Sequence, residues 1–308
     1  MLKVNKINRR KFLYTAVLIV AAFSFSGCSF TQAQGKQARK SHFTLWQLPS
    51  QTTSQMNSYV LQTGNGKIIV IDGGMKGDAA YLKGFLAALG NNVDAWFISH
   101  PHADHINALT QILNNPGDLT IDKIYASLPP EEWIEKHDTP ATLQNLRLFN
   151  ETIKKSGRKH TELSLGEVIE IDGVKIEILG IKNLEITGNA GNNSSVVMKI
   201  TDDSKSVLFT GDLGEAGGKK LLKSPYREKL KADYVQMAHH GQNGVNKAFY
   251  EVVQPKYCLW PTPRWLWDND NGGGKGSGPW VTLEVRKWMA ELGVEKHYVS
   301  AEGLQKIE

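Results

Sequence analysis

Cysteine is scarce in this sequence, since only Cys28 and Cys258 occur among its 308 residues. A fold that depends on several disulfides is therefore excluded, because two cysteines form one bridge at most. A chain of this length with 41% hydrophobic residues can instead bury a core large enough to fold without such bridges. Cys258 lies in the apolar run Tyr257–Trp260, so we expect a small buried core residue and not a reactive thiol.

Acidic residues are absent from the first 28 positions, which contain five lysines and arginines. Those five account for the whole formal net charge of +5, and residues 43–308 by themselves carry about −3. Electrostatic capture of nucleic acid by the larger part of the chain is therefore not favoured, although a local basic groove is compatible with this balance.

Long hydrophobic runs are also missing, apart from Phe12–Phe25, which is too short to cross a bilayer comfortably. Together with the basic residues before it, this run predicts a signal peptide over residues 1–28. The run ends at Phe25-Ser26-Gly27-Cys28, which resembles the lipobox of bacterial lipoproteins, with Phe25 at a position that is usually leucine. The resemblance implies that Cys28 is lipidated and anchors an exported protein to the outer face of the bacterial cell membrane.

The export route has two alternatives. Asn8-Arg9-Arg10-Lys11-Phe12-Leu13 resembles the twin-arginine signal, but a general basic segment that contains two arginines explains it equally well. Residues 29–42 lack apolar periodicity and predict a flexible tether.

From residue 43 onward, predicted strands and helices alternate and form one domain over residues 43–308. Thr139 and Pro140 are typical of a helix start, with a helix expected to about Ser156. Asp172-Gly173 predicts a hairpin between two strands. Further helices are predicted over 79–89, 106–113, 214–222, 246–252 and 281–292. This mixture, in two similar halves, favours an α+β sandwich of two mixed β-sheets with outer helices.

Three histidines and an aspartate follow directly after the predicted strand 94–99, in the order His100, His102, Asp104, His105. Imidazole and carboxylate are ligands that zinc, manganese and iron accept. In an extended segment the side chains of His100 and His102 point the same way, so both can reach one ion. Asp104 and His105 lie where the chain turns into a helix and can face a second ion.

His-x-His-x-Asp-His after a strand resembles the signature of the metallo-β-lactamase superfamily. Other motifs match in order: Asp72-Gly73-Gly74 is similar to the first, Gly211-Asp212 to the fourth, and His239-His240-Gly241 to the fifth. The resemblance implies an αββα four-layer sandwich with two divalent metal ions, zinc or, as the alternative, manganese. It also implies these metal ligands: His100, His102, Asp104, His105, Asp212 and His239.

The third motif departs from the superfamily, because Asn192-Asn193-Ser194-Ser195 stands where a histidine is usual. This pattern is similar to the hydrolase domain of bacterial competence proteins (the ComEC-like branch) and to choline-phosphate esterases of bacterial surfaces. Asn193 and Ser194 are accordingly candidates for substrate contact. His239 is the preferred ligand from the fifth motif, and His240 is a substitute ligand or supports another ligand.

The resemblance also implies the catalytic roles. Asp212 would bridge two cations, which lower the pKa of a shared water so that it attacks phosphorus or a carbonyl carbon. Asp104, Asp72 and His240 are the candidate catalytic residues. Asp72 is interpreted as orienting a ligand histidine, with a simple turn at the end of a strand as the alternative.

Tryptophans gather near the carboxyl terminus, in a stretch rich in glycine and asparagine. Trp265 and Trp267 are candidate walls of a substrate pocket, where Asp268 and Asp270 would assist in holding a quaternary ammonium, a sugar or a base. The alternative is that these indoles fill the core beneath a long loop.

The sequence thus predicts an exported metallohydrolase that acts on a phosphoester or phosphodiester, either a small molecule or a component of the cell envelope. One alternative is a nuclease on single-stranded DNA of the competence type. Lactam or lactone opening suits the fold but not the missing histidine of the third motif. A different class is a metal- or ligand-binding lipoprotein without turnover.

Overall fold

The computed structural model describes residues 42–308. The predicted signal peptide, its lipidation site Cys28 and nearly all of the predicted tether lie outside the described residues. Among residues 42–308, no helix is long and apolar enough to cross a membrane.

The first of two seven-stranded sheets has the order β14-β1-β2-β3-β4-β5-β6. Strands β14 to β3 are antiparallel, and β3 to β6 are parallel. The strands are β1 (Phe43–Gln47), β2 (Ser58–Thr63), β3 (Ile68–Asp72), β4 (Asn92–Ile98), β5 (Thr120–Ala126), β6 (Thr161–Glu162) and β14 (Gln305–Ile307).

The second sheet has the order β13-β12-β11-β10-β9-β8-β7. Strands β7 to β10 are antiparallel, and β10 to β13 are parallel. The strands are β7 (Val168–Ile171), β8 (Val174–Gly180), β9 (Val197–Thr201), β10 (Ser206–Phe209), β11 (Tyr234–Gln236), β12 (Tyr257–Trp260) and β13 (Lys296–Val299).

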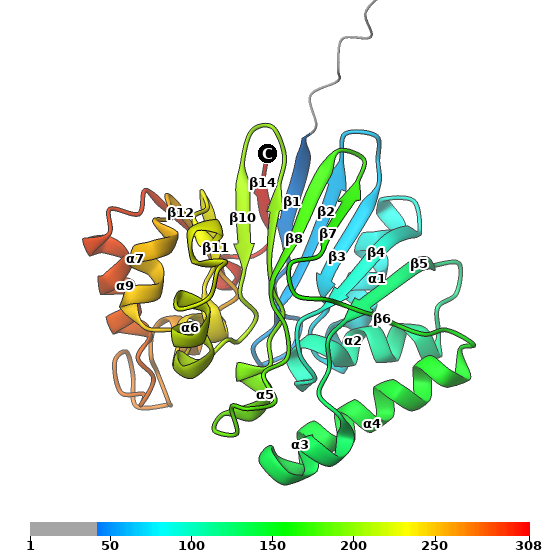
Figure 1. Ribbon diagram of the computed structural model, residues 1–308, viewed down its shortest axis with the longest axis horizontal. Coiled ribbons are helices and arrows are strands. Elements are labelled where there is room, and N and C mark those ends of the chain that lie inside the picture. The colour runs from blue at the N-terminus through cyan, green and yellow to red at the C-terminus, as the bar shows by residue number, and fades with distance from the viewer. Residues whose placement is uncertain (1–41) are drawn as a thin grey trace, which may run out of the picture. The chain divides into compact units, whose positions relative to one another are not determined.

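Helices cover the outer faces of the two sheets (Figure 1). They are α1 (Ala79–Ala88), α2 (Ala103–Asn114), α3 (Glu131–His137), α4 (Pro140–Lys155), α5 (Ala190–Asn193), α6 (Glu215–Leu222), α7 (Lys247–Val253), α8 (Arg264–Trp267) and α9 (Thr282–Glu291). Short 3-10 helices are η1 (Lys76–Asp78), η2 (Arg227–Leu230), η3 (Ala238–Gly241) and η4 (Ser300–Glu302).

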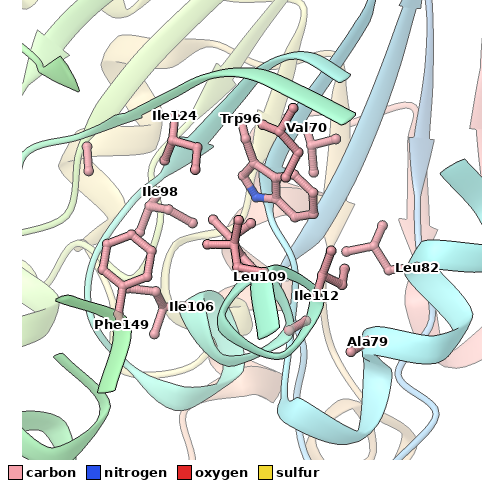
Figure 2. Close-up of a cluster of buried hydrophobic side chains, with 14 of the residues drawn as sticks. Val70, Ala79, Leu82, Trp96, Ile98, Ile106, Leu109, Ile112, Ile124 and Phe149 are labelled. Atoms are coloured by element: carbon pink, nitrogen blue, oxygen red, sulfur yellow. The ribbon is translucent and has the colours of Figure 1, made fainter. Parts of the chain in front are cut away.

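Three apolar clusters hold these layers together. One lies between the sheets and includes Phe97 and Phe209. A second lies between the first sheet and its helices, where Trp96 faces Leu109 of α2 (Figure 2). A third joins the second sheet to α6, α7 and α9 and contains buried Cys258, as predicted. The predicted αββα sandwich of two mixed sheets with outer helices is confirmed.

Local sequence signals explain several boundaries. The side chain of Thr139 accepts a hydrogen bond from Thr142 N, so α4 begins at Pro140 as predicted. Asp172 and Gly173 both have positive φ, which the tight turn between β7 and β8 requires. The short helices α3, α5 and α8 were not predicted, because segments of four to seven residues show too little periodicity.

Several strands end at the same edge of the sandwich, and this edge positions the site. Val196 N donates a hydrogen bond to Ser99 O, which follows β4, over 2.9 Å. His239 N, which follows β11, donates to Gly211 O, which follows β10, over 3.1 Å. The loops after β4, β10 and β11 therefore meet although they lie far apart in the sequence.

Candidate metal centre

The start of α2 places the histidine cluster. The helix begins at Ala103, three residues before the predicted start, because His102 is extended and its carbonyl accepts from His105 N and Ile106 N, both over 3.1 Å. Asp104 therefore lies in the first helical turn, with its side chain on the buried side of the helix. His105 is fully buried, and Asp104 is 7% exposed.

The second sheet contributes Asp212 and His240. Asp212 follows Gly211, which has a φ of +54°. The lack of a side chain at Gly211 leaves room for Ser195, because a Cβ there would lie 2.8 Å from Ser195 Oγ. His239 and His240 are also left-handed, with φ of 51° and 57°. Consecutive non-glycine residues in this region are strained, and such strain is common at functional sites.

Two groups of ligand atoms meet at Asp212. Within each group, the ligand atoms lie within 4.8 Å of one another. We call them the inner group and the outer group, because the outer group includes one residue that is only partly buried. The inner group is Asp104, His105, Asp212 and His240; the outer group is His100, His102 and Asp212.

Each buried imidazole is held through its Nδ1 atom. His105 Nδ1 lies 2.8 Å from Asp72 Oδ2, and His240 Nδ1 lies 2.8 Å from Pro261 O. His100 Nδ1 lies 3.0 Å from Ser99 Oγ. With Nδ1 occupied as a donor, each ring presents the lone pair of Nε2.

The Nε2 atoms converge on the carboxylates. His240 Nε2 lies 2.9 Å from Asp104 Oδ2, and His105 Nε2 lies 3.2 Å from Asp212 Oδ2. Within residues 42–308, the Nε2 atoms of the three buried rings make no hydrogen bond of acceptable geometry, and the same holds for Asp104 Oδ2 and Asp212 Oδ1. Buried polar atoms are seldom left in this way, and a metal ion is a partner for all of them. The cluster therefore fits two metal ions that share Asp212.

The charges of the inner group depend on one another. Burial lowers the pKa of His240, but the carboxylates of Asp212 and Asp104 outweigh burial and raise this pKa to about 10. Burial likewise raises the pKa of Asp212, but His105 and His240 hold it well below its usual value. Two buried carboxylates need positive charge beside them, which either protons on the imidazoles or a divalent cation supplies.

Asp72 lies behind His105 and belongs to neither group of ligand atoms. It is fully buried and accepts hydrogen bonds from Asn57 Nδ2, Ser99 N and Ser99 Oγ, each over 2.7 Å, besides its contact with His105. Its φ is +54°, so it also ends β3 in a left-handed conformation. The geometry makes Asp72 a residue that orients His105.

The sequence favours His239 as the metal ligand of the fifth motif, whereas the structure places His240 among the ligand atoms. His240 points inward and joins the inner group, whereas His239 is 19% exposed and belongs to neither group. His239 Nε2 lies 3.9 Å from Asp212 Oδ2 and 3.4 Å from Asn192 Nδ2. The left-handed turn at both residues places the second histidine, and not the first, against the carboxylates.

The Asn-Asn-Ser-Ser segment lies mostly inside the fold. Asn193 Oδ1 accepts from Gly217 N, and Ser194 is fully buried with its hydroxyl 3.4 Å from Asn183 N. Ser194 therefore supports the loop and does not face a substrate. Asn192 Oδ1 is buried, and the part of the chain that the structure describes offers it no hydrogen-bond partner.

The two tryptophans predicted to line a pocket have separate positions. Trp267 packs edge-on against Trp260, with the Arg286 guanidinium 4.0 Å from its ring centre, so it belongs to the core beneath the loop. Trp265 donates from Nε1 to Thr53 O over 3.0 Å and is only partly buried. For Trp267, the interpretation as a core residue therefore holds, and not the interpretation as a pocket wall.

Three side chains that support the site were not among the predicted site residues. Asp138 Oδ1 lies 3.6 Å from His102 Nε2, and its other oxygen accepts from Gly191 N. Ser99 contacts both His100 and His105, and Ser195 Oγ accepts from Asp212 N over 3.0 Å. Ser99 and Ser195 adjoin motifs that the sequence shows, whereas no sequence signal connects Asp138 with His102.

Comparison with known proteins agrees with this geometry. The model of the Metallo-beta-lactamase superfamily matches residues 52–246. The chain is 27% identical to ComE operon protein 3 of Bacillus subtilis over 179 residues, covering 57% of this chain and 21% of that protein. It is 22% identical to RNase aCSPSF2 of Saccharolobus solfataricus over 241 residues, covering 65% of this chain and 44% of that protein.

These relatives are longer proteins, of which this chain spans less than half. Among solved structures, the metallo-beta-lactamase fold protein YhfI from Bacillus subtilis superposes with a TM-score of 0.52 at 15% identity, covering 87% of this chain and 100% of that one. At that identity the likeness concerns the fold.

Proposed function

Because this chain belongs to the metallo-beta-lactamase superfamily, we propose that it is a metal-dependent hydrolase of phosphoester or phosphodiester bonds. The observation that carries the proposal is the pair of ligand groups that share Asp212, each with buried ligand atoms for which residues 42–308 supply no hydrogen bond of acceptable geometry. A protein that only binds a metal ion has no need of a second group that shares one carboxylate with the first.

The inner group offers two imidazoles and two carboxylates, and the outer group offers two imidazoles and one carboxylate. Mixed nitrogen and oxygen ligands suit zinc, with manganese as the alternative. Two divalent cations in these positions would lower the pKa of a shared water toward neutrality and neutralise charge on phosphoryl oxygens.

The residues of the chain hold this arrangement rigid. Asp72 and the carbonyl of Pro261 fix the rings of His105 and His240, so Nε2 of each ring keeps one direction. Ser195 fixes the backbone of Asp212 between the two groups. Burial of these groups excludes bulk water, so charge developing on a substrate would interact strongly with the site.

The choice of a phosphoester rests on two observations. The outer group contains two imidazoles. The segment Asn192-Asn193-Ser194-Ser195 stands where the superfamily usually has a histidine, and this departure speaks against lactam opening. One relative is by its name a ribonuclease, which acts on phosphodiesters. The mildly acidic balance of residues 43–308 disfavours a nuclease as the main activity of this chain.

The experiment uses the full chain. Its metal content is measured, and it is assayed with bis-p-nitrophenyl phosphate, p-nitrophenyl phosphorylcholine, single-stranded DNA and nitrocefin. We expect about two divalent ions per chain, turnover of a phosphoester, and loss of both properties in Asp212→Ala. Asp94→Asn is the matched control, because this carboxylate bonds Ile68 N and Lys67 at the opposite end of β4.

Two outcomes would overturn the proposal. Bound metal without any turnover would indicate a binding protein, and turnover of nitrocefin alone would indicate lactam hydrolysis. Cleavage of DNA in preference to the small phosphoesters, with a steep loss of binding as salt is added, would favour the nuclease.

We also propose that the protein is exported and lipid-anchored through Cys28, on the strength of its sequence resemblance to a lipobox. Its substrate would then be a phosphoester on the outer side of the membrane. Cells expressing the full chain should incorporate labelled fatty acid into the protein, and Cys28→Ser should abolish the label. Equal labelling of both variants would refute the anchor.

A further inference from the structure

A cleft of about 580 Å³ opens beside the candidate metal centre. Its walls come from the loop before α5, from α6, from the segment after η3 and from α9. Polar residues and one indole line it, among them Asn189, Lys219, Gln242, Asn243, Asn246 and Trp288.

The cleft is joined to the metal centre through two of its walls. The carbonyl of Asn243 lies 3.2 Å from His239 Nδ1, and Asn189 Oδ1 accepts from Asn192 Nδ2 over 2.9 Å. Asn192 and His239 contact each other, and His239 in turn lies 3.9 Å from Asp212. The cleft therefore lies directly beyond His239 and Asn192 as seen from Asp212, where the part of a substrate next to its phosphoryl group would be placed.

The charges along the cleft cancel. Lys219 Nζ lies 2.7 Å from Glu215 Oε1, and both residues line the wall. Asn246 Nδ2 also approaches this carboxylate, at 3.5 Å. The cleft thus presents neither an unpaired cation for further phosphates nor an unpaired carboxylate for a quaternary ammonium, and it suits a neutral group.

The remaining wall groups are those that bind hydroxyls. A carboxamide both donates and accepts hydrogen bonds, as a hydroxyl does. Asn189 Oδ1 and Gln242 Nε2 already bond Asn192 and Gln55, so the exposed carboxamide of Asn243 is the main group for a hydroxyl. Trp288 is partly buried, and its ring packs at the margin of the third apolar cluster. Trp288 is thus a partly exposed indole on the wall of the cleft, and an indole offers apolar surface together with one hydrogen-bond donor.

We propose that this cleft binds the carbohydrate part of a sugar phosphodiester or sugar phosphate, an inference that rests on the proposed hydrolase function. A sugar ring has an apolar face for Trp288 and a rim of hydroxyls for the carboxamides. In hydrolysis, the water oxygen bonds to phosphorus and one ester P–O bond breaks. The leaving oxygen keeps the electron pair of that bond, and the water gives up its proton to the leaving group or to solvent.

The test compares two diesters with the same leaving group, the p-nitrophenyl phosphodiester of methyl glucoside at O6 and methyl p-nitrophenyl phosphate. We expect the full, metal-loaded chain to hydrolyse the sugar diester with a kcat/KM at least about tenfold higher. Trp288→Ala should bring the ratio of the two close to unity. Lys287→Ala, at an exposed neighbour on the same helix, should keep the wild-type ratio.

A second measurement does not depend on turnover. Saturation-transfer NMR with methyl glucoside on the full chain should show binding that Asn243→Ala and Trp288→Ala both weaken, with Lys287→Ala as the control. Asn243 is exposed and its side chain is outside the hydrophobic clusters, so this variant tests the cleft even where Trp288→Ala fails to fold.

The outcomes separate the two proposals. Hydrolysis of both diesters at equal kcat/KM, unchanged by Trp288→Ala, would overturn the sugar cleft and leave the hydrolase in place. Hydrolysis of neither diester would count against the proposed hydrolase function. The NMR measurement would then show by itself whether the cleft binds a sugar. Stronger binding of a nucleoside than of the glucoside would also overturn the inference, because it would assign the indole to a base.

Discussion

The substitution Asp72→Asn tests whether Asp72 acts by orienting the ligand His105 and not by binding a metal ion itself. Asp72 is not a member of either group of ligand residues, but its Oδ2 accepts from Asn57 Nδ2, Ser99 Oγ and His105 Nδ1. In the variant, an amide NH₂ replaces one carboxylate oxygen. Either the three donors at the Oδ2 position or Ser99 N at the Oδ1 position then face a donor instead of an acceptor. In either orientation the negative charge beside His105 Nδ1 is lost, and with the NH₂ at the Oδ2 position His105 also loses the acceptor that fixes the direction of its ring.

The expected magnitude follows from these contacts. Removing the outer partner of a ligand histidine typically costs about 10- to 100-fold in metal affinity. That range corresponds to about 1.4–2.8 kcal/mol at 25 °C, since each tenfold change is worth about 1.4 kcal/mol. Only the inner group contains His105, so one ion should be weakened and the other should keep its affinity.

The assay is a metal titration of the stripped full chain by calorimetry, with bound metal counted after dialysis at limiting zinc. We expect two ions in the wild type and close to one in Asp72→Asn, with a larger loss of activity than of ground-state substrate binding. Asp94→Asn serves as the control, because it removes another carboxylate of the first sheet that bonds a backbone amide.

The reasoning would be refuted by an Asp72→Asn variant that binds both ions as tightly as the wild type. Comparing the metal affinities of the variant and the wild type requires that the metal-free variant is folded when the titration starts. Urea unfolding of the metal-free proteins measures this, and a loss of about 1–3 kcal/mol is expected from one buried group left without a partner.

Three further predictions concern other parts of the chain. Asp138→Asn should lower the affinity of the outer ion about tenfold, measured by the same titration, because Asp138 supports His102; an effect on the inner ion instead would contradict this. Burial raises the pKa of Asp202, but hydrogen bonds to its carboxylate outweigh burial and lower it. The ionised Asp202 side chain therefore stabilises the fold fully above the unfolded-state pKa of about 3.9, and this contribution is lost as the pH falls through the folded-state pKa. Asp202→Asn should cost about 1–3 kcal/mol in urea unfolding at pH 7 and less near pH 3; a cost that grows at acid pH would reverse this sign. Burial raises the pKa of the Cys258 thiol, so it should react with a thiol reagent in denaturant and remain unmodified in the native protein.

The sequence predicts most of the fold because its local signals are strong. The N-cap at Thr139 and the turn at Asp172-Gly173 depend on residues within a few positions of one another. The motif histidines indicate where ligands lie because they directly follow apolar strands. These signals need no information about distant parts of the chain.

The details of the site depend on contacts that no local pattern contains. The choice between His239 and His240 is set by two left-handed backbone conformations, which sequence periodicity does not reveal. Asp138 reaches His102 only because the start of α4 lies beside that of α2, and Ser194 is buried only because α5 packs into the fold. Such positions follow from tertiary packing.

The ligands come from both halves of the sandwich, and this has a consequence for stability. His100, His102, Asp104 and His105 follow β4 of one sheet, whereas Asp212 and His240 follow β10 and β11 of the other. A bound ion is therefore a cross-link between the halves that exists only while both are in register. Each tenfold excess of free metal over its dissociation constant adds about 1.4 kcal/mol to the free energy of unfolding. Chelation should accordingly speed hydrogen exchange first along the seam where the two sheets meet.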